Sequence, residues 1–80
     1  MHYVYLLESV THTGRRYVGT TRDLRVRLRE HNAGRSPYTS KFAPWRLVTY
    51  LAFSDQSKAE AFETYLKSGS GHAFARKRLW

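Results

Sequence analysis

Arg27 and His31 are the residues whose positions first suggest chemistry. If residues 23–33 form a helix, a rotation of about 100° per residue places both on the same face as Leu24 and Leu28. Burying a cation among apolar side chains costs free energy unless an anion pairs with it. Arg27 therefore either lies at the edge of the stripe, where it reaches water or a carboxylate, or it binds an anionic ligand.

Glu63 is a second charged residue beside an apolar helix face. That face, on a helix expected over residues 55–67, is formed by Ala59, Phe62 and Leu66. Glu63 is either a solvated carboxylate that pairs with Lys67, one turn further on, or a functional group that repeats the anomaly of Arg27 with the opposite charge. The sequence leaves both alternatives open.

Two tyrosines precede these helices in segments expected to form a β-hairpin. Residues 2–8 predict a central strand because they are apolar on both faces, and residues 16–20 predict its partner. Tyr5 and Tyr17 can each be explained as strand packing, since tyrosine is a favoured strand residue. Gly19 marks either a bend or a place where a ligand approaches the backbone closely.

The elements that must position these residues follow from the rest of the chain. Gly14 suits a turn with positive φ between the strands, and Gly34 suits the end of the first helix. Residues 35–45 predict a long structureless loop, which in so small a domain indicates use in function. Ser54 is expected to cap the next helix. The elements expected after the loop are a strand over 46–53, the helix over 55–67 and a short basic helix over 72–80.

Composition limits the class of protein. The 80 residues predict one domain, residues 1–80, near the lower size of a self-sufficient core. The absence of cysteine excludes disulfides, thiolate zinc sites and thiol nucleophiles. Without a signal peptide or an apolar run near the ~20 residues of a membrane span, we expect a cytoplasmic protein that does not enter membranes.

Charge indicates the kind of partner. Fourteen Lys and Arg oppose six Asp and Glu, which gives a net charge of +8 and an isoelectric point of about 10.3. Such a surplus implies a polyanionic partner, most often a nucleic acid.

Taken in order, these residues resemble the GIY-YIG nuclease superfamily. The matching positions are Tyr3-Val4-Tyr5, Tyr17-Val18-Gly19, Asp23-Leu24, Arg27, His31 and Glu63. The resemblance covers essentially the whole chain and is greatest to small stand-alone members, which are similar to the nuclease module of an excinuclease. The first signature departs from its namesake letters, with Tyr3 where glycine would stand, and this leaves Tyr5 undisturbed.

The resemblance implies an α+β fold, a three-stranded antiparallel sheet flanked by helices, and divalent-metal-dependent hydrolysis of DNA phosphodiesters. It assigns the catalytic roles to Tyr5, Tyr17, Arg27, His31 and Glu63. Glu63 would hold one Mg²⁺ or Mn²⁺, with waters and the substrate phosphate completing the shell. Arg27 would pair with the scissile phosphate. Tyr5, Tyr17 or His31 would remove a proton from the attacking water.

The binding surface is expected to contact phosphates without reading sequence, so selectivity would rest on strand or structure, as in repair or recombination. Its candidate residues are Gly19, Arg22, Arg25, Arg35, Lys41, Arg46, Lys67, Arg76, Lys77 and Arg78. Tyr38, Phe42 and Trp45 in the long loop either stack on unpaired bases or close the core beneath the loop.

Two other functions remain open from the sequence. The chain could be a non-catalytic nucleic-acid-binding module of the same fold. It could also be a nuclease component that cuts only when a protein partner supplies affinity for DNA, with RNA as a substrate not excluded. A nuclease has a reason to keep a carboxylate such as Glu63 near phosphates, whereas a mere binder has none.

Overall fold

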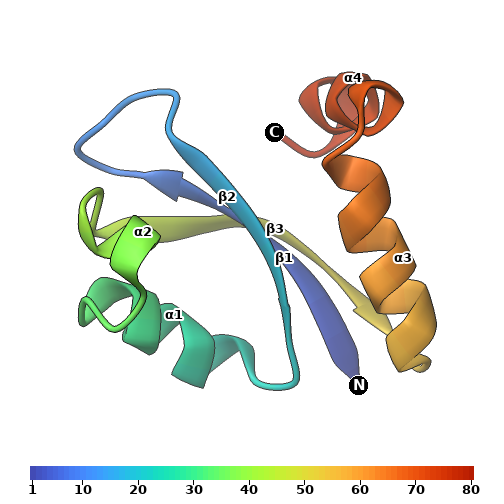
Figure 1. Cartoon of the computed structure of the whole chain (residues 1–80), viewed down its shortest axis with the longest axis horizontal. Helices are drawn as coiled ribbons and strands as arrows, with labels where there is room; N and C mark the ends of the chain where they lie inside the picture. Colours follow the sequence, from blue (N-terminus) through green and yellow to red (C-terminus); the bar gives the residue numbers. More distant parts are fainter.

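The computed structural model describes residues 1–80 as a three-stranded antiparallel sheet with helices on both sides (Figure 1). The α+β architecture expected from the sequence is confirmed. The elements are β1 (His2–Ser9), β2 (Arg16–Thr21), α1 (Leu24–Asn32), α2 (Pro37–Ser40), β3 (Trp45–Phe53), α3 (Gln56–Leu66) and α4 (Gly69–Arg78). None of these helices is long and apolar enough to cross a lipid bilayer.

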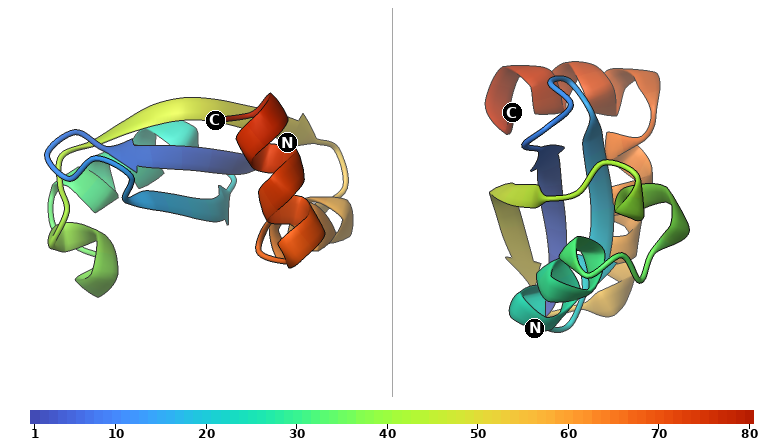
Figure 2. Two further views of the ribbon diagram at one scale, coloured as in Figure 1. Left: turned by 90° about the horizontal axis from the view of Figure 1, so that it is seen from above. Right: turned by 90° about the vertical axis from the view of Figure 1, so that its left-hand side faces the viewer.

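Strand β1 is the centre of the sheet, as its two-sided apolarity predicts. It pairs with β2 on one side and β3 on the other, and both pairings are antiparallel. Its alternate side chains enter two separate cores. Val4 and Leu6 pack with α3 and α4, whereas Tyr5 and Leu7 pack with α1 and Trp45. Figure 2 shows these two groups of helices from two further directions.

Helices α1 and α3 begin at aspartates. The side chain of Asp23 accepts a hydrogen bond from the Val26 amide at 3.1 Å. Asp55, and not Ser54 as expected, caps α3 by accepting from the amides of Ser57 and Lys58. Aspartate and serine are equally good caps, so the sequence alone could not choose between these adjacent positions.

The segment expected to be a structureless loop contains the short helix α2. Pro37 stands at its first position, where a proline costs no hydrogen bond and its fixed φ suits the helix. Trp45 anchors the segment, because its indole Nε1 donates to the Thr39 carbonyl at 2.7 Å. Trp45 is also buried. Of the two alternatives for this residue, stacking on unpaired bases or closing the core beneath the loop, the structure therefore shows the second.

Helix α4 starts three residues earlier than expected, at Gly69 instead of residue 72. Ser68 provides the cap, and its hydroxyl accepts from the Gly71 amide at 3.2 Å. A side chain at Gly71 would overlap the Tyr65 backbone. Gly71, in the stretch that was expected only to end the preceding helix, therefore lets α4 approach the end of α3 closely.

Candidate active site

Tyr5 reaches the outer edge of the sheet by crossing over Gly19. The two residues are paired directly across β1 and β2. A Cβ atom on Gly19 would lie 2.5 Å from the Tyr5 hydroxyl oxygen and 2.7 Å from the carbon that bears it. Gly19 was expected to bend the strand or meet a ligand, but the group that approaches it is the Tyr5 phenol.

The Tyr5 hydroxyl begins a buried chain of hydrogen bonds. It lies 2.9 Å from His31 Nε2, and His31 Nδ1 lies 2.7 Å from Thr39 Oγ1. His31 and Thr39 have no solvent-exposed area. Thr39 Oγ1 is also 3.5 Å from the carbonyl of Ser36, to which it can donate its single proton. Thr39 then accepts from His31 Nδ1–H, and this network assigns Nε2 as the acceptor for the Tyr5 hydroxyl.

Arg27, in the middle part of α1, contacts the same hydroxyl. Its Nε donates to the Tyr5 oxygen over 3.4 Å, and its Nη1 donates to Glu30 Oε1 at 3.0 Å. The Arg27 side chain remains 33% exposed. Arg27 is thus at the edge of the apolar stripe and paired with a carboxylate, while part of its guanidinium still faces solvent.

The surroundings keep both Tyr5 and His31 neutral at physiological pH. Burial raises the pKa of the Tyr5 phenol, and the hydrogen bond from Arg27 offsets this only in part. Burial also lowers the pKa of His31, and the positive charge of Arg27 acts in the same direction. A neutral imidazole therefore accepts, through Nε2, a hydrogen bond from a protonated phenol.

Tyr17 joins this group through its ring. The ring packs edge-on against His31, with centroids 5.0 Å apart, and lies 6.2 Å from the rings of Tyr5 and Tyr38. Its hydroxyl makes no hydrogen bond with another residue, and the side chain is half-buried. Tyr17 is consequently the phenol of the pair whose oxygen is free to meet a substrate or a water.

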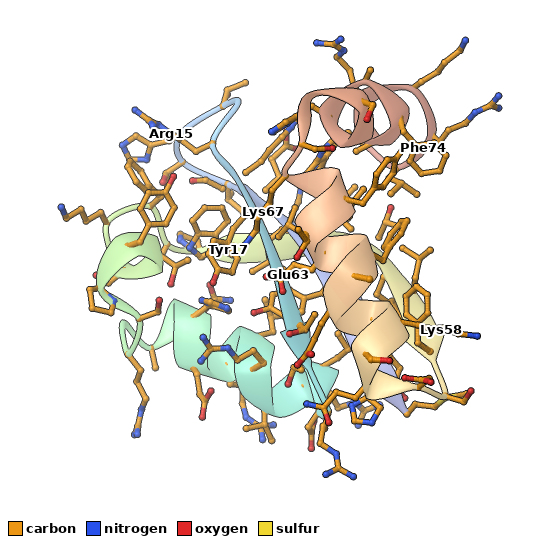
Figure 3. The ribbon with its side chains drawn as sticks, turned by 45° about the vertical axis from the view of Figure 1, so that its right-hand side comes forward. Arg15, Tyr17, Lys58, Glu63, Lys67 and Phe74 are labelled. Atoms are coloured by element: carbon orange, nitrogen blue, oxygen red, sulfur yellow. The ribbon has the colours of Figure 1, made fainter.

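Glu63 approaches from α3, on the other side of the sheet. Its Oε2 accepts from Lys67 Nζ at 2.9 Å, so the expected ion pair one helical turn apart is present. The carboxylate side chain is 23% exposed, and its negative charge contributes to raising the pKa of Tyr5. Figure 3 shows Glu63 and Lys67 projecting from α3 toward β2, on the side where Tyr17 lies.

The structure distributes the expected binding residues over several surfaces. Lys67 and Arg76 line one cavity with Tyr17, whereas Arg22 borders a smaller hollow near Glu60 at the other end of β2. Arg46 is tied to Glu8 by an ion pair of 2.6 Å. The remaining candidates, all exposed, are Arg25, Arg35, Lys41, Lys77 and Arg78.

Thr39 is the site residue that sequence reasoning missed. Nothing in its local sequence marks it, because it lies among the prolines and aromatics of a segment expected to be irregular. The one usable signal was the unusual length of that segment, which indicated function without naming a residue.

The geometry defines a class of protein: a small α+β domain in which a phenol, an imidazole and a guanidinium meet at the edge of a three-stranded sheet. Comparison with known proteins agrees, since residues 1–77 match the GIY-YIG catalytic domain. The chain therefore belongs to the GIY-YIG family, as its signatures suggested. It is a nuclease domain with a nucleic acid as its substrate.

Relatives of similar size support this membership. The chain is 40% identical over 68 residues to the UPF0213 protein HQ_3675A of Haloquadratum walsbyi, covering 84% of this chain and 74% of the relative. It is 36% identical over 78 residues to the UPF0213 protein BH0048 of Halalkalibacterium halodurans, covering 96% and 77%. A UPF0213 protein of Lacticaseibacillus paracasei is 35% identical over 72 residues, covering 89% and 79%.

Proposed function

We propose that this chain is a divalent-metal-dependent endonuclease that hydrolyses phosphodiester bonds of DNA. The observation that carries the proposal is the buried chain from the Tyr5 hydroxyl through His31 to Thr39, with Arg27 at the open end. A non-catalytic binding module has no need for a neutral imidazole aimed at a buried phenol. Proton transfer does need such an arrangement.

The donor set fits one hard divalent cation. No group of three or more His, Cys, Asp or Glu side chains could enclose a metal in this fold. Mg²⁺ and Mn²⁺ are commonly held by only one or two carboxylates together with waters and substrate phosphates. Glu63, a partly exposed carboxylate, would hold Mg²⁺ or Mn²⁺ once the metal ion takes the place of the Lys67 ammonium group. The bound ion would supply charge stabilisation to the phosphate undergoing hydrolysis.

The residues of the chain divide the remaining work. Arg27 would donate its free N–H groups to the scissile phosphate and stabilise the charge that develops there. We assign the Tyr5–His31 pair as the base. As the Tyr5 oxygen accepts a proton from the attacking water, its own proton passes to His31 Nε2, and Thr39 holds the resulting imidazolium. Tyr17, whose hydroxyl is free, would orient that water.

The substrate is proposed to be DNA selected by strand or structure. Exposed cations on α1, on both sides of α2 and on α4 can contact phosphates. Such contacts carry no sequence information. Branched or single-stranded DNA arising in repair or recombination in the cytoplasm fits this surface. RNA is tested as a substrate beside DNA.

A nicking assay on supercoiled DNA with Mg²⁺ or Mn²⁺ tests the proposal. The wild type should nick, whereas Glu63→Gln and Arg27→Ala should bind DNA and nick at least 100-fold more slowly, because each removes charge stabilisation. Matched controls come from the same helices: Glu60→Gln on α3 and Arg29→Ala on α1, both exposed. These two variants should nick at the wild-type rate.

The assay also separates the alternatives. A Glu63→Gln variant that nicks like the wild type would overturn the metal assignment. A wild type that binds but cuts no form of DNA or RNA would identify a binding module. A wild type that cuts only after fusion to an unrelated DNA-binding domain would identify a nuclease component that depends on a partner.

A further inference from the structure

A cavity of about 450 Å³ adjoins the site at the edge of β2. It lies between the turn of the β1–β2 hairpin, α2, and the junction of α3 with α4; Figure 3 shows Arg15, Tyr17 and Lys67 around it. Its volume falls in the range of sites that hold small molecules, about 300–1,000 Å³. The residues that line the cavity come from parts of the chain that lie far apart in the sequence, and Arg15, Arg16 and Trp80 were not among the expected binding residues.

The charge of the cavity selects an anion. Its cations are Arg15, Arg16, Lys67 and Arg76, and no Asp or Glu lines it. Two of these cations are held in place by aromatic rings. The Arg16 guanidinium lies 4.7 Å above the ring of Trp80, and that of Arg15 lies 4.8 Å above Phe42. Arg15 and Arg16 are therefore positioned before any ligand arrives, which lowers the entropy cost of binding an anion.

The aromatic lining selects a flat ligand. Tyr17, Tyr38 and Trp80 all border the cavity, and Tyr38 is 46% exposed. An exposed phenol ring next to cations is the combination on which single-stranded bases stack while their phosphates are neutralised. One occupant that satisfies both features is a nucleotide with an unpaired base.

Two residues that line the cavity also contact the reacting groups. Tyr17 borders it and also packs against His31 at 5.0 Å, while Lys67 borders it and also holds Glu63 at 2.9 Å. A nucleotide in the cavity would therefore be a neighbour of the scissile phosphate in the same strand.

We propose that this cavity is a subsite for one unpaired nucleotide next to the scissile phosphate. The base lies against Tyr38, and the phosphate lies between Lys67 and Arg76. The subsite rests on the proposed function, and it narrows the substrate to DNA in which a nucleotide beside the cleavage point is already unpaired or easily extruded.

Titration of the full-length chain with a deoxynucleoside monophosphate, followed by amide NMR shifts, tests the subsite without needing hydrolysis. dAMP should shift resonances of residues 14–18, Tyr38, Lys67 and Arg76, whereas inorganic phosphate should bind at least fivefold more weakly. Tyr38→Ala should weaken dAMP binding at least fivefold. Tyr38→Phe, which keeps the ring, should bind like the wild type. Unchanged shifts of Tyr5 and His31 would show that both variants are folded.

Three results would overturn the subsite: equal binding of inorganic phosphate and dAMP, shifts located elsewhere, or identical affinities of Tyr38→Ala and Tyr38→Phe. A second measurement uses oligonucleotides with a single abasic position scanned along the strand. The wild type should bind the oligonucleotide more weakly when the abasic position falls at one particular place in the strand. Tyr38→Ala should bind all of these oligonucleotides equally. If nicking succeeds and these tests fail, only the subsite is lost. If dAMP binds as expected and nicking fails, the hydrolytic function is lost and the cavity stands as a nucleotide-binding site alone.

Discussion

Thr39 determines how His31 can act. It accepts from His31 Nδ1 at 2.7 Å in a place without solvent, so it fixes the ring and leaves Nε2 for the Tyr5 hydroxyl. Thr39 touches no substrate in this arrangement, and we regard it as a positioning residue.

Replacement of this hydroxyl gives a prediction at the residue scale. Thr39→Val keeps the shape but leaves the Nδ1–H of His31 without a partner, which should cost about 1–3 kcal/mol of unfolding free energy. The nicking rate should fall because the imidazole is no longer held in one tautomer. Urea unfolding and nicking rates check both effects, and Thr39→Ser should restore them. Equal behaviour of the valine and serine variants would contradict the positioning role.

His31 gives a second prediction, on pH. Its pKa is lowered by burial and by Arg27, so the unfolded chain binds the proton more readily than the folded protein. The stability is therefore complete above the ordinary pKa of about 6.5 and falls as the pH drops below it. Urea unfolding between pH 7.5 and 5 should show this loss, and His31→Gln should reduce it. A variant with the same pH dependence as the wild type would contradict the assignment.

Residue types and spacing predicted much of the site. Arg27 and His31 stood out because they interrupt an apolar stripe, and the family resemblance joined them to Tyr5. What could not be predicted is the role of Gly19: the register that sets it opposite Tyr5 depends on how the two strands pair. The link from His31 to Thr39 was equally hidden, because it depends on how the segment after α1 folds back.

At the scale of elements, the contact of α4 with α3 rests on one glycine of the two that begin α4. A Cβ at Gly69 would meet nothing within 4 Å, whereas a Cβ at Gly71 would overlap the Tyr65 backbone. Gly69→Ala should raise the unfolding free energy by about 0.4–1 kcal/mol, because the unfolded chain loses freedom. Gly71→Ala should destabilise the protein. Thermal unfolding of the two variants side by side checks this, and equal melting temperatures would contradict it.

Most elements followed from local patterns, and the errors have local causes. Strands and long helices were predicted because their apolar periodicities extend over many residues. Helix α2 has four residues, too few for any periodicity. The start of α4 was hidden because glycines disfavour helices unless a close contact requires them, and that contact is tertiary.

At the scale of the whole molecule, the net charge of +8 should make DNA binding strongly dependent on salt. The slope of log affinity against log salt counts the phosphates contacted. Arg76→Ala, at the cavity, should reduce this slope by about 1. Lys58→Ala is the matched control, because Lys58 lies at the far end of α3 and points away from the cavity (Figure 3). Equal slopes for the two variants would show that the cavity face does not bind the strand.

The division of the side chains of β1 between two cores has a consequence for heat inactivation. Glu63 belongs to the helix layer on one side, while Arg27, His31 and Thr39 belong to the other. Partial detachment of α3 from the sheet would remove Glu63 from the site and leave Arg27, His31 and Thr39 in place. Cleavage should accordingly cease at a lower temperature than the one at which the sheet itself melts.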